Sequence, residues 1–177
     1  MLPAMPVIVG PTAGGKTEVA VRTAHALTEH LRAPAEIVSA DSMMVYRGMD
    51  IGTAKPTEDE REGVRHHLID VADPWEPFSV DRWRQLAEEA ITDIRARGGV
   101  PVVAGGTHLY VKALLEGLFE GPPADTALRA ELTDMDAESR RALLERVDPE
   151  AAARIHPNDI RRAVRALEVW KLTGTPL

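Results

Sequence analysis

Residues 10–17, with the sequence GPTAGGKT, have the composition and spacing of a phosphate-binding loop. In the pattern G-x-x-x-x-G-K followed by Ser or Thr, backbone N–H groups surround phosphate oxygens, the lysine reaches the outer phosphate and the hydroxyl holds Mg²⁺. The predicted phosphate ligands are Gly10, Pro11, Thr12, Ala13, Gly14, Gly15, Lys16 and Thr17, with Thr17 as the Mg²⁺ ligand. A glycine-rich turn is the alternative, but the apolar run before the loop and the helical pattern after it favour a di- or triphosphate site.

Residues 39–56 form a long polar connection that follows a short apolar strand at residues 36–39. Such connections usually have about 2–6 residues, and open α/β sheets bind ligands at the carboxyl ends of their strands. A functional role is therefore favoured for Asp41 and its neighbours. The alternatives are a cap or turn role for Asp41 and a core position for Met43 and Met44.

Residues 105–107, Gly-Gly-Thr, also follow a buried strand and precede a helix, so their amides can face the same ligand. The adjacent pair His66 and His67 could suggest a metal site. Neighbouring residues on a strand point to opposite faces, however, which favours one packed and one solvent-facing histidine.

The elements that must position these residues alternate between strand and helix. Strands are predicted at residues 6–9, 36–39, 67–71 and 100–104, and helices at 18–31, from Ser79 to about 97, and at 108–115. This alternation predicts an α/β fold, a P-loop NTPase or kinase-like parallel sheet flanked by helices. Trp83 is expected in the core.

The composition changes at residues 117–123, where we place a boundary between a core domain, residues 1–117, and a helical region, residues 118–177. Helices are predicted in the second part at residues 124–133, 137–147, 149–155 and 158–172, an α-helical insert or second subdomain. On the last helix, Arg161, Arg162, Arg165 and Lys171 could form a solvated charged face or contact a phosphate backbone.

The 177 residues are 44% hydrophobic and 28% charged, which is ordinary for a globular protein. The absence of cysteine excludes disulfides and cysteine-based zinc sites. No apolar run approaches the ~18 residues that span a bilayer, so no membrane partner is expected and a cytoplasmic location fits. A net charge of −7 argues against a generally basic nucleic-acid-binding surface but permits a local one.

Several of these segments together resemble the tRNA dimethylallyltransferases, which transfer isopentenyl-type groups and have a P-loop kinase-like core. The resembling segments are GPTAGGKT at 10–17, ADS at 40–42, YRGMDIGTAKP at 46–56, HHLID at 66–70, GGT at 105–107 and HPND at 156–159. Gly14 stands where the family usually has serine, and Arg161 where glutamine is usual. Family members are longer, so the resemblance implies that the rest of the core follows residue 177.

The resemblance implies transfer of a dimethylallyl group from dimethylallyl diphosphate to N6 of the adenosine 3′ of a tRNA anticodon, with Mg²⁺ as cofactor. It implies that Asp41 is the base and that Thr107 contacts the reaction centre. Other tRNA contacts are implied for Ser42, Met43, Met44, Arg161, Arg162 and Arg165. Trp75 is expected to be a packing residue, and the protein is expected to be a monomer.

Three other functions remain as alternatives. A small-molecule P-loop kinase would use the same loop for ATP but has no role for residues 41–56. An isopentenyltransferase that acts on free adenine nucleotides is a closer relative. A nucleotide-regulated binding module without chemistry is the third.

Overall fold

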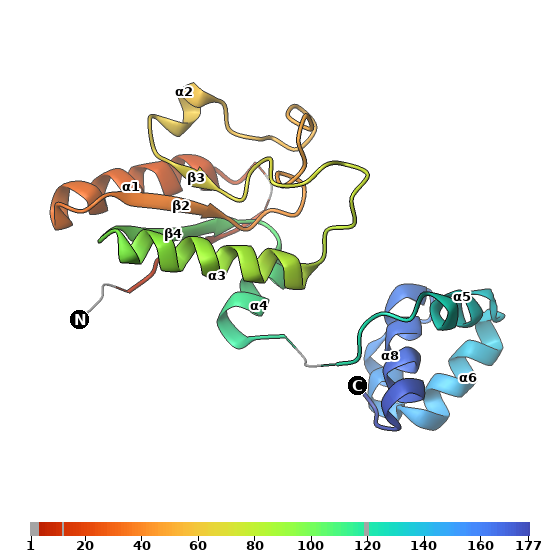
Figure 1. Ribbon diagram of the computed structural model, residues 1–177. Coiled ribbons are helices and arrows are strands. Elements are labelled where there is room, and N and C mark those ends of the chain that lie inside the picture. Colours follow the sequence, from red (N-terminus) through yellow and green to blue (C-terminus); the bar gives the residue numbers. More distant parts are fainter. Residues whose placement is uncertain (1–3, 12, 119–120) are drawn as a thin grey trace. The chain divides into compact units, whose positions relative to one another are not determined.

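The computed structural model describes residues 4–11, 13–118 and 121–177 (Figure 1). The chain divides into two compact units, Met1–Leu118 and Phe119–Leu177. The division falls within residues 117–123, where the composition of the sequence changes.

In the part of the chain that the structure describes, the first unit contains a four-stranded sheet in the order β1-β4-β2-β3. These strands are β1 (Val7–Val9), β2 (Ala35–Ser39), β3 (His66–His67) and β4 (Val100–Gly105). All neighbours are parallel, as predicted, and Val103 of β4 pairs with Val7 on one side and Val38 on the other. The carboxyl ends of β1, β2 and β4 therefore meet at one edge of the sheet.

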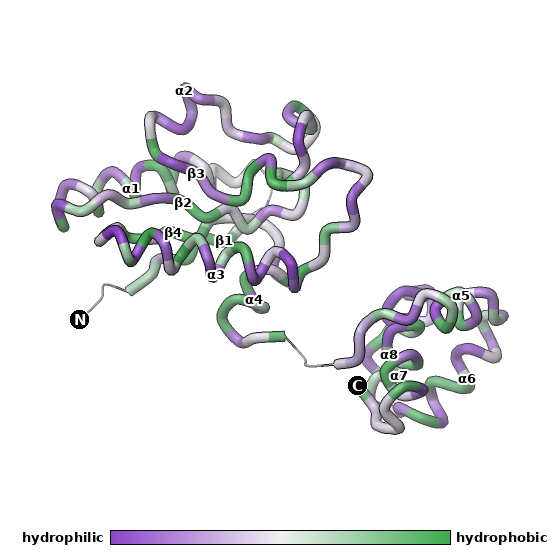
Figure 2. The backbone as a smooth tube through the Cα atoms, viewed as in Figure 1, coloured by the Kyte–Doolittle hydropathy of each residue, from purple (hydrophilic) through white to green (hydrophobic). Residues whose placement is uncertain are grey.

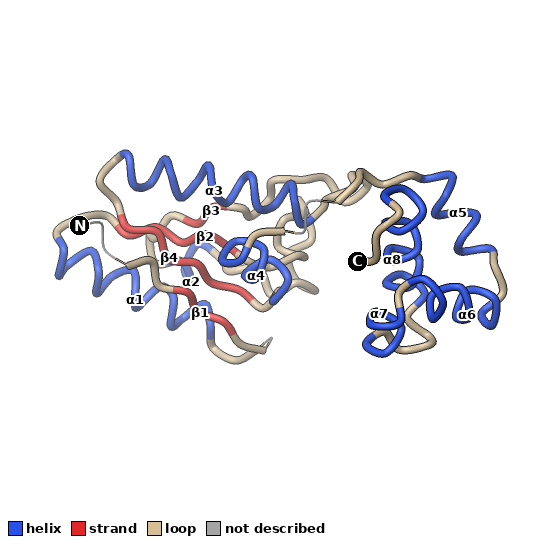
Figure 3. Tube along the Cα trace, turned by 90° about the horizontal axis from the view of Figure 1, so that it is seen from below, coloured by secondary structure: helices blue, strands red, loops and turns tan. Residues whose placement is uncertain are grey.

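Helices pack on both faces of this sheet (Figure 3). Alternate strand residues face opposite sides. Ile37 and Val102 join the cluster that contains residues of α1 (Lys16–Leu31), whereas Val38 and Val103 join the cluster with α3 (Val80–Ala96) and α4 (His108–Glu116). Hydrophobic residues predominate along β4, β3 is hydrophilic, and the two kinds of residue alternate along α3 (Figure 2).

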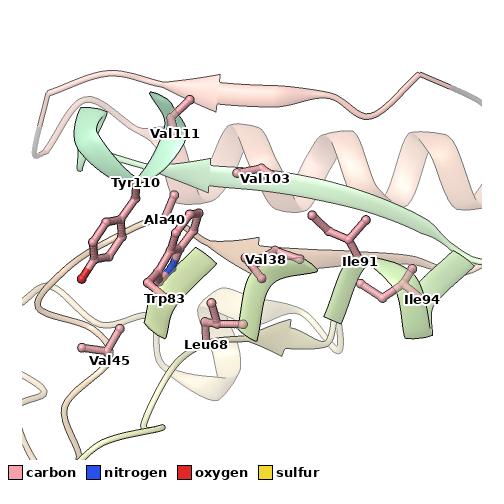
Figure 4. Packing of buried hydrophobic residues seen from close by; sticks show 11 residues of the cluster. Val38, Ala40, Val45, Leu68, Trp83, Ile91, Ile94, Val103, Tyr110 and Val111 are labelled. Carbon is pink, nitrogen blue, oxygen red and sulfur yellow. The ribbon is translucent and has the colours of Figure 1, made fainter. Parts of the chain in front are cut away.

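Trp83 lies at the centre of the α3 core and is fully buried, as predicted. Helix α3 begins after Ser79, whose hydroxyl accepts from the Arg82 amide at 3.1 Å. The indole ring stacks on Tyr110 with centroids 4.5 Å apart, and its N–H donates to the Ser39 carbonyl at 3.0 Å (Figure 4). This bond ties α3 to the end of β2, next to the segment that carries Asp41.

The strand predicted at residues 67–71 is wrong beyond His67. Leu68 and Asp70 have φ angles of 63° and 59°, in the left-handed region that interrupts a strand. The chain then pairs with residues 44–46 instead, through Val71 N to Val45 O at 2.8 Å and a parallel bridge between Tyr46 and Ala72. The segment after Asp41 is thus held against the segment after β3.

The second unit is built from α5 (Thr126–Asp134), α6 (Ala137–Val147), α7 (Pro149–Arg154) and α8 (Ile160–Thr173). An aspartate caps the N-terminus of each helix by accepting a backbone amide: Asp125, Asp136, Asp148 and Asp159. Such caps satisfy amides that have no partner within the helix. The apolar face of α8 then packs on α5 and α6 through residues such as Val164 and Leu167.

Glu168 of α8 is a fully buried carboxylate at the centre of the second unit. It accepts from the Asp125 amide at 2.8 Å, from Arg129 at 2.8 and 2.9 Å, and from Arg165 at 2.6 Å. Burial opposes its ionisation, but the bonds from the two arginines outweigh this and lower the pKa of Glu168 from 4.5 to about 2. The carboxylate therefore stays charged and links α5 to α8.

None of the helices in the described ranges has the length and apolar character needed to cross a bilayer.

Candidate active site

The phosphate loop connects β1 to α1, so its amides lie at the carboxyl edge of the sheet. Gly14 N donates to Pro11 O at 3.1 Å, and Lys16, the first residue of α1, donates from Nζ to Pro11 O at 2.6 Å. The loop therefore curls into a closed turn at the positive end of a helix, which suits an anion. Thr12, which was predicted to bind phosphate, lies outside the described residues.

The three glycines of this loop differ in whether the structure would tolerate a side chain at their positions. Gly15 has a φ of 71°, and a Cβ on Gly14 would lie 3.0 Å from the Pro11 carbonyl oxygen. Both positions disfavour a side chain. A Cβ on Gly10 would meet only Lys16 carbons at 3.7 Å, an ordinary contact, so protein packing does not require that glycine.

The Gly-Gly-Thr turn after β4 lies beside the phosphate loop. A Cβ on Gly105 would overlap the backbone of Ala40, which allows the ends of β2 and β4 to approach closely. The Gly106 position faces Lys16, with the Lys16 Nζ 3.6 Å from where its Cβ would be. Three predicted segments, at residues 10–17, 40–44 and 105–107, are thus neighbours at one edge of the sheet.

Asp41 lies two residues after the end of β2 and accepts hydrogen bonds that close a turn. Its Oδ1 accepts from the Met43 amide at 2.9 Å and the Met44 amide at 3.4 Å. Asp41 is therefore a turn residue, which was one of the two predicted roles. This role is compatible with a chemical one, because the turn fixes the orientation of the carboxylate. Asp41 also lines the pocket described below.

Ser42 and Thr107 connect the Asp41 turn to the Gly-Gly-Thr turn. The Thr107 hydroxyl accepts from the Ser42 amide at 2.9 Å and donates to the Ser42 hydroxyl at 3.2 Å. Thr107 precedes α4 but makes no side-chain cap there, so its hydroxyl serves this cross-connection. Residues that are 65 positions apart in the sequence are thereby held together.

A pocket of about 460 Å³ joins these elements. The phosphate loop lines one part, through residues 13–17, and Asp41 and Met44 line another. A further wall comes from Thr53, Ala54, Pro56 and Ile69. Met43, by contrast, is 45% exposed and does not line the pocket. The pocket brings a phosphate-binding loop and the Asp41 carboxylate to one cavity, so a phosphate-bearing ligand bound by the loop can lie near a proton acceptor.

His66 lines the same pocket, and the expectation of one solvent-facing histidine is wrong. His66 Nδ1 lies 2.9 Å from Val64 O, and burial lowers the pKa of His66, which favours the neutral ring. His67 is mostly buried and bonds Glu36 at 2.6 Å. Within the described ranges, no three His, Cys, Asp or Glu side chains are grouped as a metal site.

The predicted tRNA-binding arginines lie on α8 in the second unit. Arg161 and Arg162 are exposed, and Arg162 pairs with Asp159 at 3.4 Å. The guanidinium of Arg165 bonds Glu168 and the Pro122 carbonyl, the latter at 3.1 Å, so Arg165 has a structural role in its own unit. Its predicted tRNA contact stays a prediction.

The expectation that Trp75 is a packing residue is wrong, because this side chain is 81% exposed. It follows Pro74 in the connection between β3 and α3, where the chain leaves the core. The burial of Lys55 was not predicted from the sequence, since a lysine among polar loop residues is expected to be exposed to solvent.

Residues 44–177 match the family model described as IPP transferase. The chain belongs to this family. Among IPP transferase relatives, the tRNA dimethylallyltransferase of Methylococcus capsulatus is 56% identical over 99% of this chain and 56% of its own length. That of Geobacillus thermodenitrificans is 50% identical over 96% of this chain and 54% of its own length. The chain thus spans about half the length of the curated relatives it matches.

Solved structures of IPP transferases also resemble this chain. The tRNA isopentenylpyrophosphate transferase of Bacillus halodurans is 48% identical, with a TM-score of 0.60, over 97% of this chain and 56% of its own. A eukaryotic dimethylallyltransferase acting on tRNA is 32% identical, with a TM-score of 0.78, over 97% of this chain and 42% of its own. These similarities and the sheet described above confirm the predicted fold class.

Proposed function

We propose that this IPP transferase carries the prenyl-transfer site of a tRNA dimethylallyltransferase. The reaction would move a dimethylallyl group from dimethylallyl diphosphate to N6 of the adenosine 3′ of the anticodon. The observation that carries the proposal is the shared pocket, because the phosphate loop and Asp41 line one cavity. The names of relatives that are about half identical over nearly the whole chain support the substrate class.

The two sides of the pocket fit the two halves of the reaction. The bond between the prenyl carbon and the diphosphate oxygen breaks while a bond from adenine N6 to that carbon forms. The diphosphate leaves with its electron pair, and the N6 proton passes to a base, for which we propose Asp41. The adenine amine is a poor nucleophile because its lone pair is delocalised, so a base in this position typically contributes about 10² to 10⁴-fold.

The phosphate loop would stabilise the departing diphosphate. Its amides and Lys16 Nζ provide hydrogen bonds and positive charge where negative charge grows, which favours the transition state. Thr17 lines the pocket, and its hydroxyl is an oxygen ligand of the kind that Mg²⁺ accepts together with phosphate oxygens and water. When bound there, the cation would supply further charge stabilisation to the diphosphate.

A buried site can reach N6 only if the adenosine is flipped out of its stack. Ser42, Thr107 and Met44 lie beside Asp41 and would contact the flipped base, and the exposed Arg161 and Arg162 would contact the tRNA backbone. We also propose a cytoplasmic location, with which a tRNA substrate is consistent. We propose that the protein works as a monomer, which sedimentation of the complete protein would check.

Labelled dimethylallyl diphosphate tests the proposal when it is incubated with the full-length protein and either tRNA, AMP or no acceptor. We expect label in tRNA alone. Label in AMP would instead indicate an enzyme of free nucleotides, and transfer from ATP without prenyl transfer would indicate a kinase.

The Lys16→Ala variant tests the role of the loop. Loss of the Lys16 ammonium should weaken binding of inorganic diphosphate by about tenfold or more, because a charge-assisted hydrogen bond contributes about 1.5–3 kcal/mol. Calorimetry measures this affinity directly. Unchanged binding would show that the loop serves another ligand.

A further inference from the structure

Lys55 is a buried lysine at the end of the segment that begins at Asp41. Its side chain is only 4% exposed. The ammonium donates to the Asp50 and Asp70 carboxylates, each at 2.6 Å, and to the Tyr46 carbonyl at 2.9 Å. An ammonium has three N–H donors, so each donor has a protein acceptor.

These bonds join two stretches of chain that are separated by α2 (Glu58–Arg61) and β3. Asp50 belongs to the same loop as Lys55, whereas Asp70 follows β3. Burial alone would lower the pKa of the Lys55 ammonium, but the bonds to Asp50 and Asp70 outweigh this and raise it. Lys55 therefore remains charged and fastens the loop to the segment after β3.

The backbone around Lys55 is held in an unfavourable conformation. Ala54 has a φ of 52° and Asp70 a φ of 59°, both in the left-handed region that residues with a Cβ avoid. Such conformations persist where surrounding contacts impose them, and they concentrate at functional sites. The Lys55 bonds act next to Ala54 and on Asp70 itself.

The residues next to Lys55 and Asp70 in the sequence form one wall of the pocket. Ala54 and Pro56 flank Lys55, Ile69 precedes Asp70, and all three line the pocket that the phosphate loop also lines. These three side chains are apolar, as contact with a dimethylallyl group requires, and the fourth residue of the wall is Thr53. We propose that Lys55 is a positioning residue, whose contacts with Asp50 and Asp70 fix the wall that holds the dimethylallyl group for attack. This inference rests on the proposed function.

The Lys55→Met variant of the full-length protein tests the inference. Displacement of the wall by about 1 Å should lower kcat for prenyl transfer about 10²-fold. Affinity for inorganic diphosphate, which lacks the group that the wall would hold, should stay within about twofold, while the additional affinity that the dimethylallyl group gives should be lost. Lys112→Met is the matched control, because Lys112 is 68% exposed and pairs only at the surface, with Glu116 at 3.7 Å.

A second variant separates positioning from stability. Lys55→Met leaves two carboxylates without their cation and should lower Tm. Combining it with Asp70→Asn removes part of that repulsion, so Tm should rise again while kcat stays low. Recovery of kcat together with Tm would overturn the inference, and so would a kcat of Lys55→Met within about twofold of the wild type.

The affinity measurements do not depend on turnover. If the wild-type protein transfers no prenyl group, the proposed function fails. A prenyl-dependent affinity that is lost in Lys55→Met would then still support the wall, whereas equal affinities for diphosphate and dimethylallyl diphosphate in the wild type would overturn it.

Discussion

At the scale of single residues, Asp41 combines a structural and a proposed chemical role. Its Oδ1 accepts two amides of its own turn, at Met43 and Met44. An asparagine keeps a carbonyl oxygen that can accept both amides but cannot take up a proton in the same way. Asp41→Asn should therefore preserve the turn while lowering the rate of prenyl transfer about 10² to 10⁴-fold.

Single-turnover measurements with tRNA and dimethylallyl diphosphate check this rate, and circular dichroism checks the fold. Asp134→Asn, a change at an exposed aspartate of α5, serves as the control. Near-normal transfer by Asp41→Asn would show that another group accepts the N6 proton.

Local patterns of residue types predicted the phosphate loop and singled out the segments that carry Asp41 and Thr107, whereas the roles of these two residues were implied by the family resemblance. Lys55 and Trp75 were not predictable, since burial depends on contacts between distant segments. Lys55 is buried where it can bond Asp70, which lies 15 positions further along the chain, and Trp75 is exposed although tryptophan usually packs.

At the scale of elements, the close approach of β2 and β4 places Asp41 beside the Gly-Gly-Thr turn. A side chain at residue 105 would overlap the Ala40 backbone. Gly105→Ala should therefore lower the free energy of unfolding by about 3 kcal/mol or more, because backbone has little freedom to yield. Urea unfolding of the complete protein measures this change.

Gly106→Ala is the matched comparison for that experiment. Its Cβ would lie 3.5 Å or more from its neighbours, so the free energy of unfolding should change by less than about 0.5 kcal/mol. Equal effects of the two substitutions would contradict the argument from the Ala40 contact.

Most helix positions followed from the sequence because their caps are local, as at Ser79 and Asp159. The order of the strands did not follow, because β4 enters between β1 and β2 through contacts that chain order does not specify. The end of β3 was misplaced because Leu68 and Asp70, neither of which is glycine, adopt left-handed backbone.

At the scale of the whole molecule, the two units have separate cores, and Glu168 anchors the second one. Glu168→Gln removes the negative charge that pairs with two arginines and should lower the free energy of unfolding of this unit by about 3 kcal/mol. This value is the lower end of the range for breaking a buried ion pair, because both arginines are partly exposed. Glu131→Gln, which breaks a surface pair with Lys171 at 2.7 Å, should cost less than about 1 kcal/mol.

The effect of Glu168→Gln should depend on pH. The pKa of Glu168 is lowered from 4.5 to about 2 in the folded protein, so its stabilisation is present above about pH 4.5 and is lost as the pH falls toward 2. Hydrogen exchange of amides in α5 and α8 measures the difference between wild type and variant. A difference that stays constant across this range would show that the carboxylate is not responsible.

The hydrogen bond between the Trp83 indole and the Ser39 carbonyl suggests a use for tryptophan fluorescence. The chain has three tryptophans, of which Trp83 is fully buried against Tyr110 and Trp75 is largely exposed. Trp83 should fluoresce at shorter wavelength and resist quenching by acrylamide, whereas Trp75 should be quenched. Because Ser39 itself lines the pocket, the Trp83 emission should respond to a ligand that binds there. In a background that carries both Trp75→Phe and Trp170→Phe, Trp83 is the single tryptophan and ligand binding can therefore be followed without any added dye.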